Sequence, residues 1–235
     1  MGSSKPYKKY RPGGSKIKKI KASLDKKLKN IQWGEYRIGD LFEIKPTKSY
    51  KLNNDKLFNK NGLYPVVTNS SNNNGITGYS TLSPTEKGNM ITYSDTTTSE
   101  GIFYQPRDFI GYSHIQGLYP IKYNEKWNYF SLIYVVAAFK KSAAGKFNYG
   151  NKFNRNIAKE LLIQLPTKNG EIDFEFMDAY ISELEEERIS ELAAYLTVSG
   201  LDNYKLSTLE REALDLVLAD KLTWAEFRIG DLFEK

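Results

Sequence analysis

The sequence predicts an α+β fold, in which a mixed, β-rich core with long loops precedes a long helix and a second, shorter helix. Between Trp33 and Leu165, short runs of strand-forming residues alternate with clusters of Asn, Gly, Ser and Thr. From residue 173 onward, apolar side chains recur instead at helical spacing. The chain has 235 residues, of which 40% are hydrophobic, so one sizeable core can form.

The N-terminal region is strongly basic. Residues 1–14 read as a flexible basic arm that ends in a Pro-Gly-Gly break, and residues 15–32 as a basic amphipathic helix. The apolar stripe of this helix consists of Ile17, Ile20, Leu24, Leu28 and Ile31. Two interpretations stay open: a solvated cationic helix, or a helix that packs along an acidic partner helix.

Residues 33–172 form the predicted body. The runs "YPVVTNSSNNNGITGYS", "GNMITYSDTTTSEGIFYQ" and "GLYPIKY" have strand-and-turn spacing, with Gly and Asn at positions that suit a positive φ. Residues 127–143, "WNYFSLIYVVAAFKKSA", predict a buried helix. "IAKELLIQLP" predicts a short helix or turn that runs into a strand, which we expect to stop at Pro166.

The C-terminal region predicts two helices. Residues 173–199 form a spacer or dimerisation helix that ends at Gly200, and residues 207–222 form a second helix opened by a Ser207–Glu210 capping box. The helical stripe of the first consists of Met177, Ile181, Leu184, Leu192 and Leu196. Its acidic run is either a solvated face or a match for the basic helix 15–32, since opposite charges beside apolar seams suit coiled-coil pairing.

Composition excludes several classes of function. Cysteine is absent and His114 is the single histidine, so neither a thiolate nor a multi-histidine metal site can form. No phosphate-binding loop occurs, and triplets such as "EIK" are too common to define a nuclease. No apolar run is long enough to span a bilayer, and no signal peptide is evident. We therefore expect a cytoplasmic protein that is not an enzyme and has no membrane contact.

The charge is unevenly distributed along the chain. The net charge of +6 divides into +10 for residues 1–32, +6 for residues 33–172 and −10 for residues 173–235. A basic body joined to an acidic tail suggests that one surface meets an anion and the other meets protein.

One segment of the body combines basic, amide and aromatic side chains. No acidic residue occurs between Glu125 and Glu160, and the centre of this window reads "GKFNYGNKFNR". Lys and Arg neutralise phosphates, while Asn and Arg match base edges. The alternative is a solvated cationic loop. The DNA-binding candidates here are Lys140, Lys141, Lys146, Asn148, Tyr149, Asn151, Lys152 and Arg155.

Three other loops carry short polar side chains of the kind that reads bases. Each loop alone is a weak signal, because Asn, Ser and Thr are common in the turns of any β-rich domain. Their occurrence together with the acid-free segment is the stronger observation. These further DNA-binding candidates are Asn69, Asn72, Asn73, Thr96, Thr97, His114 and Gln116. For His114, a structural hydrogen-bonding role is the favoured alternative.

The chain contains a long-range repeat. "WGEYRIGDLFE" at residues 33–43 returns as "WAEFRIGDLFE" at residues 224–234, with nine of eleven positions identical. The offset of 191 residues is the size of a domain rather than of a solenoid unit. Residues 224–235 therefore look like the truncated start of a second copy of the domain.

The opening motif, together with "YPVVTNSSNNNGITGY", "GNMITYSD" and "KFNYGNKFNRNIAKELLIQLP" before an acidic helix, resembles the target recognition domains of Type I restriction–modification specificity subunits and the related Type IIB chains. The resemblance covers about residues 33–200. It implies a non-catalytic chain that reads half of a split target in double-stranded DNA and docks methyltransferase and restriction (translocase) subunits. S-adenosylmethionine, ATP and Mg would then belong to the partner subunits alone.

Such subunits carry two recognition domains, whereas this chain holds one. Either it is a fragment, or it is a half-subunit that dimerises and reads a gapped inverted repeat. A helix of about 27 residues spans roughly 40 Å, on the order of one turn of DNA, which suits two domains on one side of a duplex. The alternative is a truncated or decoy protein that binds the methyltransferase without sequence-specific recognition.

Overall fold

The computed structural model describes residues 24, 26–95, 99–147, 153–201 and 205–219. Within it the chain divides into two compact units, one of residues 13–188 and one that contains residues 189–235. The expected α+β class is confirmed. The arm at 1–14, the repeat at 224–235 and the site candidates at 96–97 and 148–152 lie outside the described residues, as do Ile17 and Ile20.

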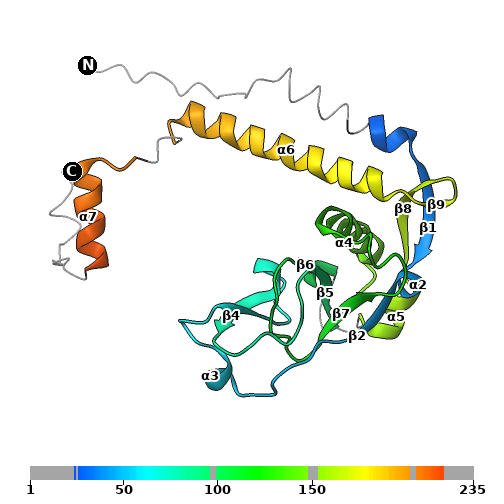
Figure 1. Ribbon diagram of the computed structural model, residues 1–235, viewed down its shortest axis with the longest axis horizontal. Helices are drawn as coiled ribbons and strands as arrows, with labels where there is room; N and C mark the ends of the chain where they lie inside the picture. The colour runs from blue at the N-terminus through cyan, green and yellow to red at the C-terminus, as the bar shows by residue number, and fades with distance from the viewer. Residues whose placement is uncertain (1–23, 25, 96–98, 148–152, 202–204, 220–235) are drawn as a thin grey trace, which may run out of the picture. The chain divides into compact units, whose positions relative to one another are not determined.

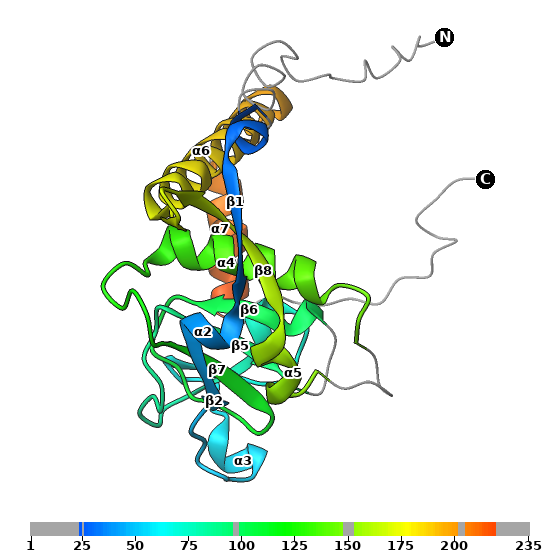
Figure 2. The same cartoon turned by 90° about the vertical axis from the view of Figure 1, so that its right-hand side faces the viewer.

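The repeated motif opens the first sheet. Its three antiparallel strands have the order β1-β8-β9, and β1 and β8 run side by side in Figure 2. They are β1 (Gln32–Arg37), β8 (Leu162–Lys168) and β9 (Glu171–Ile172). The expectation that the strand stops at Pro166 is wrong. Pro166 pairs with Trp33 on one side, and β9 pairs only from Thr167 onward, so no ladder partner on the other side requires an N–H from proline.

The second sheet forms the centre of the larger unit. Its four antiparallel strands have the order β2-β7-β5-β6, and the helix α2 (Ile38–Leu41) leads from β1 into β2 (Figure 1). The strands are β2 (Phe42–Pro46), β5 (Met90–Ser94), β6 (Ile102–Gln105) and β7 (Ile115–Pro120). All five residues of β5 are buried, as expected for an interior strand covered on both faces.

A smaller hairpin carries one of the polar loops. β3 (Tyr64–Val67) pairs with β4 (Ile76–Ser80), and the short helices α3 (Asn54–Leu57) and η1 (Asn73–Gly75) accompany it. Asn73 and Asn74 have positive φ values of 48° and 53°, which confirms the role predicted for Asn in these turns. A further single turn, η2 (Ser99–Gly101), precedes β6.

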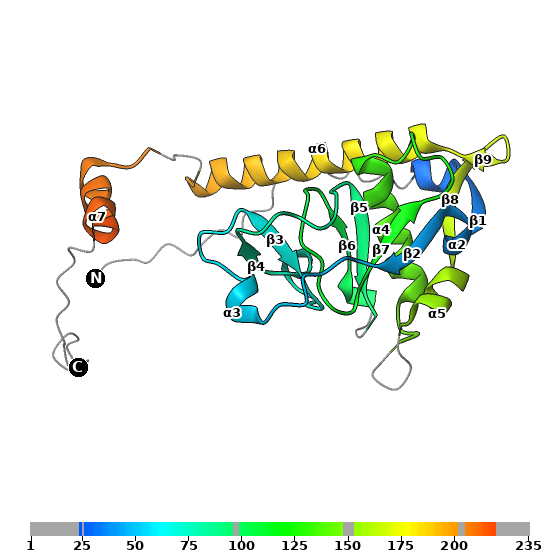
Figure 3. The same cartoon turned by 60° about the horizontal axis from the view of Figure 1, so that its bottom comes forward.

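Two helices pack on the sheets. α4 (Tyr129–Ala143) lies against the sheets (Figure 3), in contact with β8 and β6. Its apolar face buries Leu132, Val135 and Phe139. Asn128 caps its first turn by accepting from the Ser131 backbone N–H at 3.1 Å. α5 (Arg155–Glu160) is capped in the same way by Asn154. The helix predicted at 127–143 is therefore confirmed, two residues shorter at its start.

The acidic helix α6 (Phe174–Ser199) follows β9, and α7 (Thr208–Leu218) comes after it. Gly200 has a φ of +72°, and the Leu201 N–H returns to the Leu196 carbonyl at 2.9 Å, which is the glycine-terminated end predicted for this helix. The Ser207–Glu210 capping box is also present. Within the described part of the chain, no helix is both long and apolar enough to cross a membrane.

Candidate nucleic-acid interface

The opening motif serves the scaffold. Ile38, Leu41 and Phe42 are at most 2% exposed and belong to the main core. Arg37 donates to Asp40 at 2.8 Å and to Glu160 at 3.0 Å, and the hydrogen bond from Arg37 holds the pKa of Asp40 below its usual value. The motif therefore connects two sheets through the buried side chains of Ile38, Leu41 and Phe42 and through the ion pairs of Arg37, while its Trp33 is 44% exposed.

A groove of about 500 Å³ forms where the end of α4 meets two loops. The loop between β3 and β4 contributes Ser71, and the turn before β6 contributes Glu100. Lys140 and Lys141 line it from α4. The structure thus brings two predicted cations next to one of the predicted polar loops, although about 70 residues separate them in the sequence.

Lys140 is held against an aromatic ring. Its Nζ lies 4.7 Å from the centroid of Phe103 on β6, so the ammonium group is fixed by a cation–π contact. Burial lowers the pKa of Lys140, and the charge of Glu100 opposes that shift. Lys141 and Lys146 are exposed, and Lys140 is half-buried.

The β3–β4 loop is anchored by its backbone and exposes its side chains. The Thr68 N–H donates to the Gly75 carbonyl at 2.8 Å, and Gln105 Nε2 on β6 donates to the Asn74 carbonyl at 2.9 Å. The candidates Asn69, Asn72 and Asn73 are all exposed on this loop. The side chain of Asn73 also donates to the Ile76 carbonyl at 3.2 Å, so its orientation is set within the turn.

A second cluster lies where β5 ends and β7 begins. Asp95 faces His114 and Gln116: His114 Nδ1 is 3.1 Å from one carboxylate oxygen, and Gln116 Nε2 donates to the other at 2.8 Å. The His114 side chain is 63% exposed and its φ is +66°. Gln116, in contrast, is 3% exposed. Of the two candidates, His114 faces solvent, whereas Gln116 is buried and donates a hydrogen bond to Asp95.

Arg155 lies close to this cluster. Burial raises the pKa of Tyr93 on β5 well above its usual value; the charge of Asp95 adds to the shift and that of Arg155 opposes it. Both charged groups therefore act on the same phenol. Arg155 is exposed in the first turn of α5, beside Phe153, whose ring packs 4.8 Å from Tyr93.

Sequence reasoning missed three residues of this surface, namely Asp95, Glu100 and Phe103. Two of them are acidic, and a search for basic and amide side chains passes over acids. The signal for Asp95 was its position directly after the strand-forming run "NMITYS". Among the described residues, no group of three or more His, Cys, Asp or Glu side chains is arranged to hold a metal ion.

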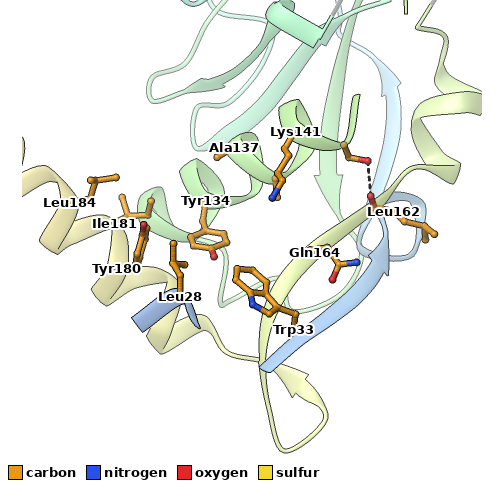
Figure 4. Close-up of a pocket in the computed structure, with 12 residues that line it drawn as sticks. Leu28, Trp33, Tyr134, Ala137, Lys141, Leu162, Gln164, Tyr180, Ile181 and Leu184 are labelled. Atoms are coloured by element: carbon orange, nitrogen blue, oxygen red, sulfur yellow. Dashed lines mark hydrogen bonds between the residues drawn. The ribbon is translucent and has the colours of Figure 1, made fainter. Parts of the chain in front are cut away.

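The basic N-terminal helix contacts the acidic helix of the same chain. Residues 26–30 are helical, Leu24 is 3% exposed, and Lys27 forms an ion pair with Glu183 on α6. Figure 4 shows Leu28 beside Tyr180 and Ile181 at an apolar pocket of about 510 Å³, with Trp33 on the other side. The described part of the basic helix is thus not a free cationic helix, because it packs on α6.

The apolar stripe of α6 continues beyond this pocket. Met177 and Ile181 are buried, but Leu192 is 58% exposed. Ile189 and Tyr195, on the same helix, are exposed as well. The stripe predicted from the sequence is therefore divided between a buried and an exposed part. α7 exposes apolar side chains as well, Leu209 and Leu218 among them.

Comparison with known proteins agrees with this architecture. The profile of the family described as "Type I restriction modification DNA specificity domain" matches residues 30–194. The specificity subunit of a Type II restriction enzyme from Heyndrickxia coagulans is 28% identical over 160 residues, which are 67% of this chain and 45% of that protein. This chain therefore spans less than half of its curated relative.

Solved structures share the fold. A Type I restriction–modification S subunit from M. genitalium superimposes with a TM-score of 0.51 at 16% identity, covering 86% of this chain and 48% of that one. A structure of an assembled type I restriction–modification system gives a TM-score of 0.52 at 14% identity, covering 88% of this chain and 54% of that one. The chain belongs to the Type I restriction–modification DNA specificity family, which confirms the resemblance inferred from the motifs.

Proposed function

We propose that this chain is the non-catalytic sequence-reading component of a restriction–modification system, and that its body reads one half of a bipartite target in double-stranded DNA. The observation that carries the proposal is the family match over residues 30–194, which spans the whole β-rich body and most of α6. The local geometry supports it, because Lys140 and Lys141 of α4 line one groove together with Ser71 of the exposed β3–β4 loop.

The candidate contacts divide into two kinds. Lys140, Lys141, Lys146 and Arg155 carry charges that suit phosphates, which supply affinity without sequence information. Asn69 and Asn72 are exposed amides of the kind that pairs with adenine edges in the major groove. Asn148, Tyr149, Asn151, Lys152, Thr96 and Thr97 remain candidates from the sequence alone.

The helices are proposed to bind protein. Exposed apolar side chains on α6 and α7 suit contact with a methyltransferase subunit or with a second copy of this chain. A two-fold pair of identical chains would read a gapped inverted repeat. S-adenosylmethionine, ATP and Mg are assigned to the methyltransferase and restriction subunits, and no cofactor to this chain.

The same exposed helices favour a second candidate, an assembly protein that binds the methyltransferase without reading DNA. Co-expression with the neighbouring methyltransferase subunit, in a host without other adenine methylation, separates the two. A gapped inverted repeat in the map of modified adenines supports sequence reading by a pair of chains. A stable complex without new methylation supports the assembly protein.

The DNA face is tested by charge removal in the full chain. The double change Lys141→Ala and Lys146→Ala is expected to reduce the slope of log K against log salt by about two, at roughly 0.9 per phosphate contact. Lys87→Ala is the matched control, because this lysine is 91% exposed and paired with Asp108. An unchanged slope in the double variant would place the DNA elsewhere.

A further inference from the structure

Asp95 is a carboxylate in contact with His114 and Gln116, two of the residues that the sequence predicts to bind DNA. Phosphates repel a carboxylate, so a solvent-facing Asp at a DNA-binding surface weakens binding unless it meets a base. Asp95 nevertheless lies at the end of the buried strand β5, with its side chain 22% exposed. Its backbone N–H donates to the His114 carbonyl at 3.1 Å, which fixes the residue against the start of β7.

The two carboxylate oxygens of Asp95 are oriented by hydrogen-bond partners but can each accept a further hydrogen bond. One accepts from Gln116 Nε2 at 2.8 Å and the other lies 3.1 Å from His114 Nδ1. Because each carboxylate oxygen has two lone pairs, each can accept one more hydrogen bond. Gln116 is almost fully buried, and its Oε1 atom has no hydrogen-bond partner. The Gln116 side chain therefore donates from its nitrogen to Asp95, while its buried oxygen accepts no hydrogen bond.

An acceptor held in this way selects for a donor. In the major groove, only the N4 amino group of cytosine and the N6 amino group of adenine donate, whereas guanine and thymine present acceptors at the equivalent positions. A carboxylate repels those acceptors, so it discriminates by exclusion as well as by attraction.

We propose that Asp95 is a specificity-determining residue that accepts a hydrogen bond from the exocyclic amino group of a cytosine or an adenine in the target, with Gln116 and His114 as positioning residues. The inference rests on the proposed function and adds to it one named residue and the class of base that it reads. One position of each half-site is thereby restricted to C or A.

The test is a binding selection from randomised duplexes with the full chain and its Asp95→Asn variant. The wild type is expected to select C or A at one half-site position, and Asp95→Asn to lose that preference about tenfold or more while the other positions stay unchanged. Asp108→Asn is the matched control, a carboxylate in another loop whose two oxygens accept from Lys87 Nζ and from the Gly88 backbone N–H.

A second measurement alters the DNA instead of the protein, and its wild-type arm does not depend on the folding of Asp95→Asn. Replacing the selected adenine by purine, or the cytosine by 2-pyrimidinone, removes the amino group alone. Wild-type affinity is expected to fall about tenfold, and the variant is expected to show no further loss, since the two changes remove the same contact.

Three results would overturn the inference. If Asp95→Asn lowers affinity equally for all sequences, or if the amino-free base binds normally, Asp95 only positions its loop, while the proposed function stands. If the wild type selects no sequence at all, the proposed function fails and this inference with it.

Discussion

The two halves of α6 follow the same amphipathic pattern but differ in what covers them. In the first half, Phe174, Met177 and Ile181 are at most 9% exposed and belong to the main core. In the second half, Ile189, Leu192, Tyr195 and Val198 are between 51% and 68% exposed. The apolar residues of one helix are therefore covered within the chain in its first half and exposed in its second.

The largest difference between the halves is expected in stability. Met177→Ala removes a fully buried side chain and should lower the free energy of unfolding by about 2–5 kcal/mol. Leu192→Ala truncates an apolar side chain on the same helix and should change it by less than about 0.5 kcal/mol. Urea unfolding of both variants at a concentration where the chain is monomeric gives the comparison. Equal losses would show that the second half is also covered in the monomer.

The second half is expected to matter for association instead. Leu192→Ser combined with Tyr195→Ser should weaken self-association or methyltransferase binding at least fivefold, because exposed apolar and aromatic side chains dominate such interfaces. Sedimentation over a dilution series measures this, with Thr197→Ala, an exposed neighbour, as control. Association that is unaffected would remove α6 from the proposed interface.

The smallest effect is expected at the ion pair that joins the basic helix to the first half of α6. Lys27 and Glu183 keep side-chain exposures of 44% and 30%, so Lys27→Ala should lower stability by less than about 1 kcal/mol, and by less still in high salt. Lys29→Ala is the control on the same helix. A larger, salt-independent loss would mean that the stem of Lys27 contributes through packing.

Local signals in the sequence predicted the local structure well. The strands of the body, the helix capped at Asn128, the glycine end at Gly200 and the box at Ser207 depend on residues close together in the chain. The helix ends could be read from short windows because hydrogen bonds between near neighbours decide them, and the strands from their residue types and the turn residues that flank them. The prediction that the strand stops at Pro166 was wrong. Proline fits inside β8 because the partner strand β9 is short and pairs only with Thr167 and Lys168.

Long-range arrangement could not be read in the same way. The order β2-β7-β5-β6 pairs β2 with β7, which are far apart in the sequence, and inserts β7 beside β5, and no local pattern specifies either pairing. The burial of Gln116 and its contact with Asp95 follow from that order, since β5 and β7 are neighbours only in space. The same pairing brings the acid Asp95 next to Gln116 and His114, two residues that the sequence predicted to bind DNA.

The junction around α2 and the β3–β4 loop differ in how much sequence change each can tolerate. A methyl group on Gly39 would come within 3.0 Å of the Lys159 carbonyl, and the flanking Ile38 and Leu41 are buried, so this short stretch tolerates little change. The β3–β4 loop is exposed along most of its length and contributes little to the core. Substitutions in the loop can therefore change which bases are contacted without loss of the fold, because the junction keeps the two sheets connected in the same way.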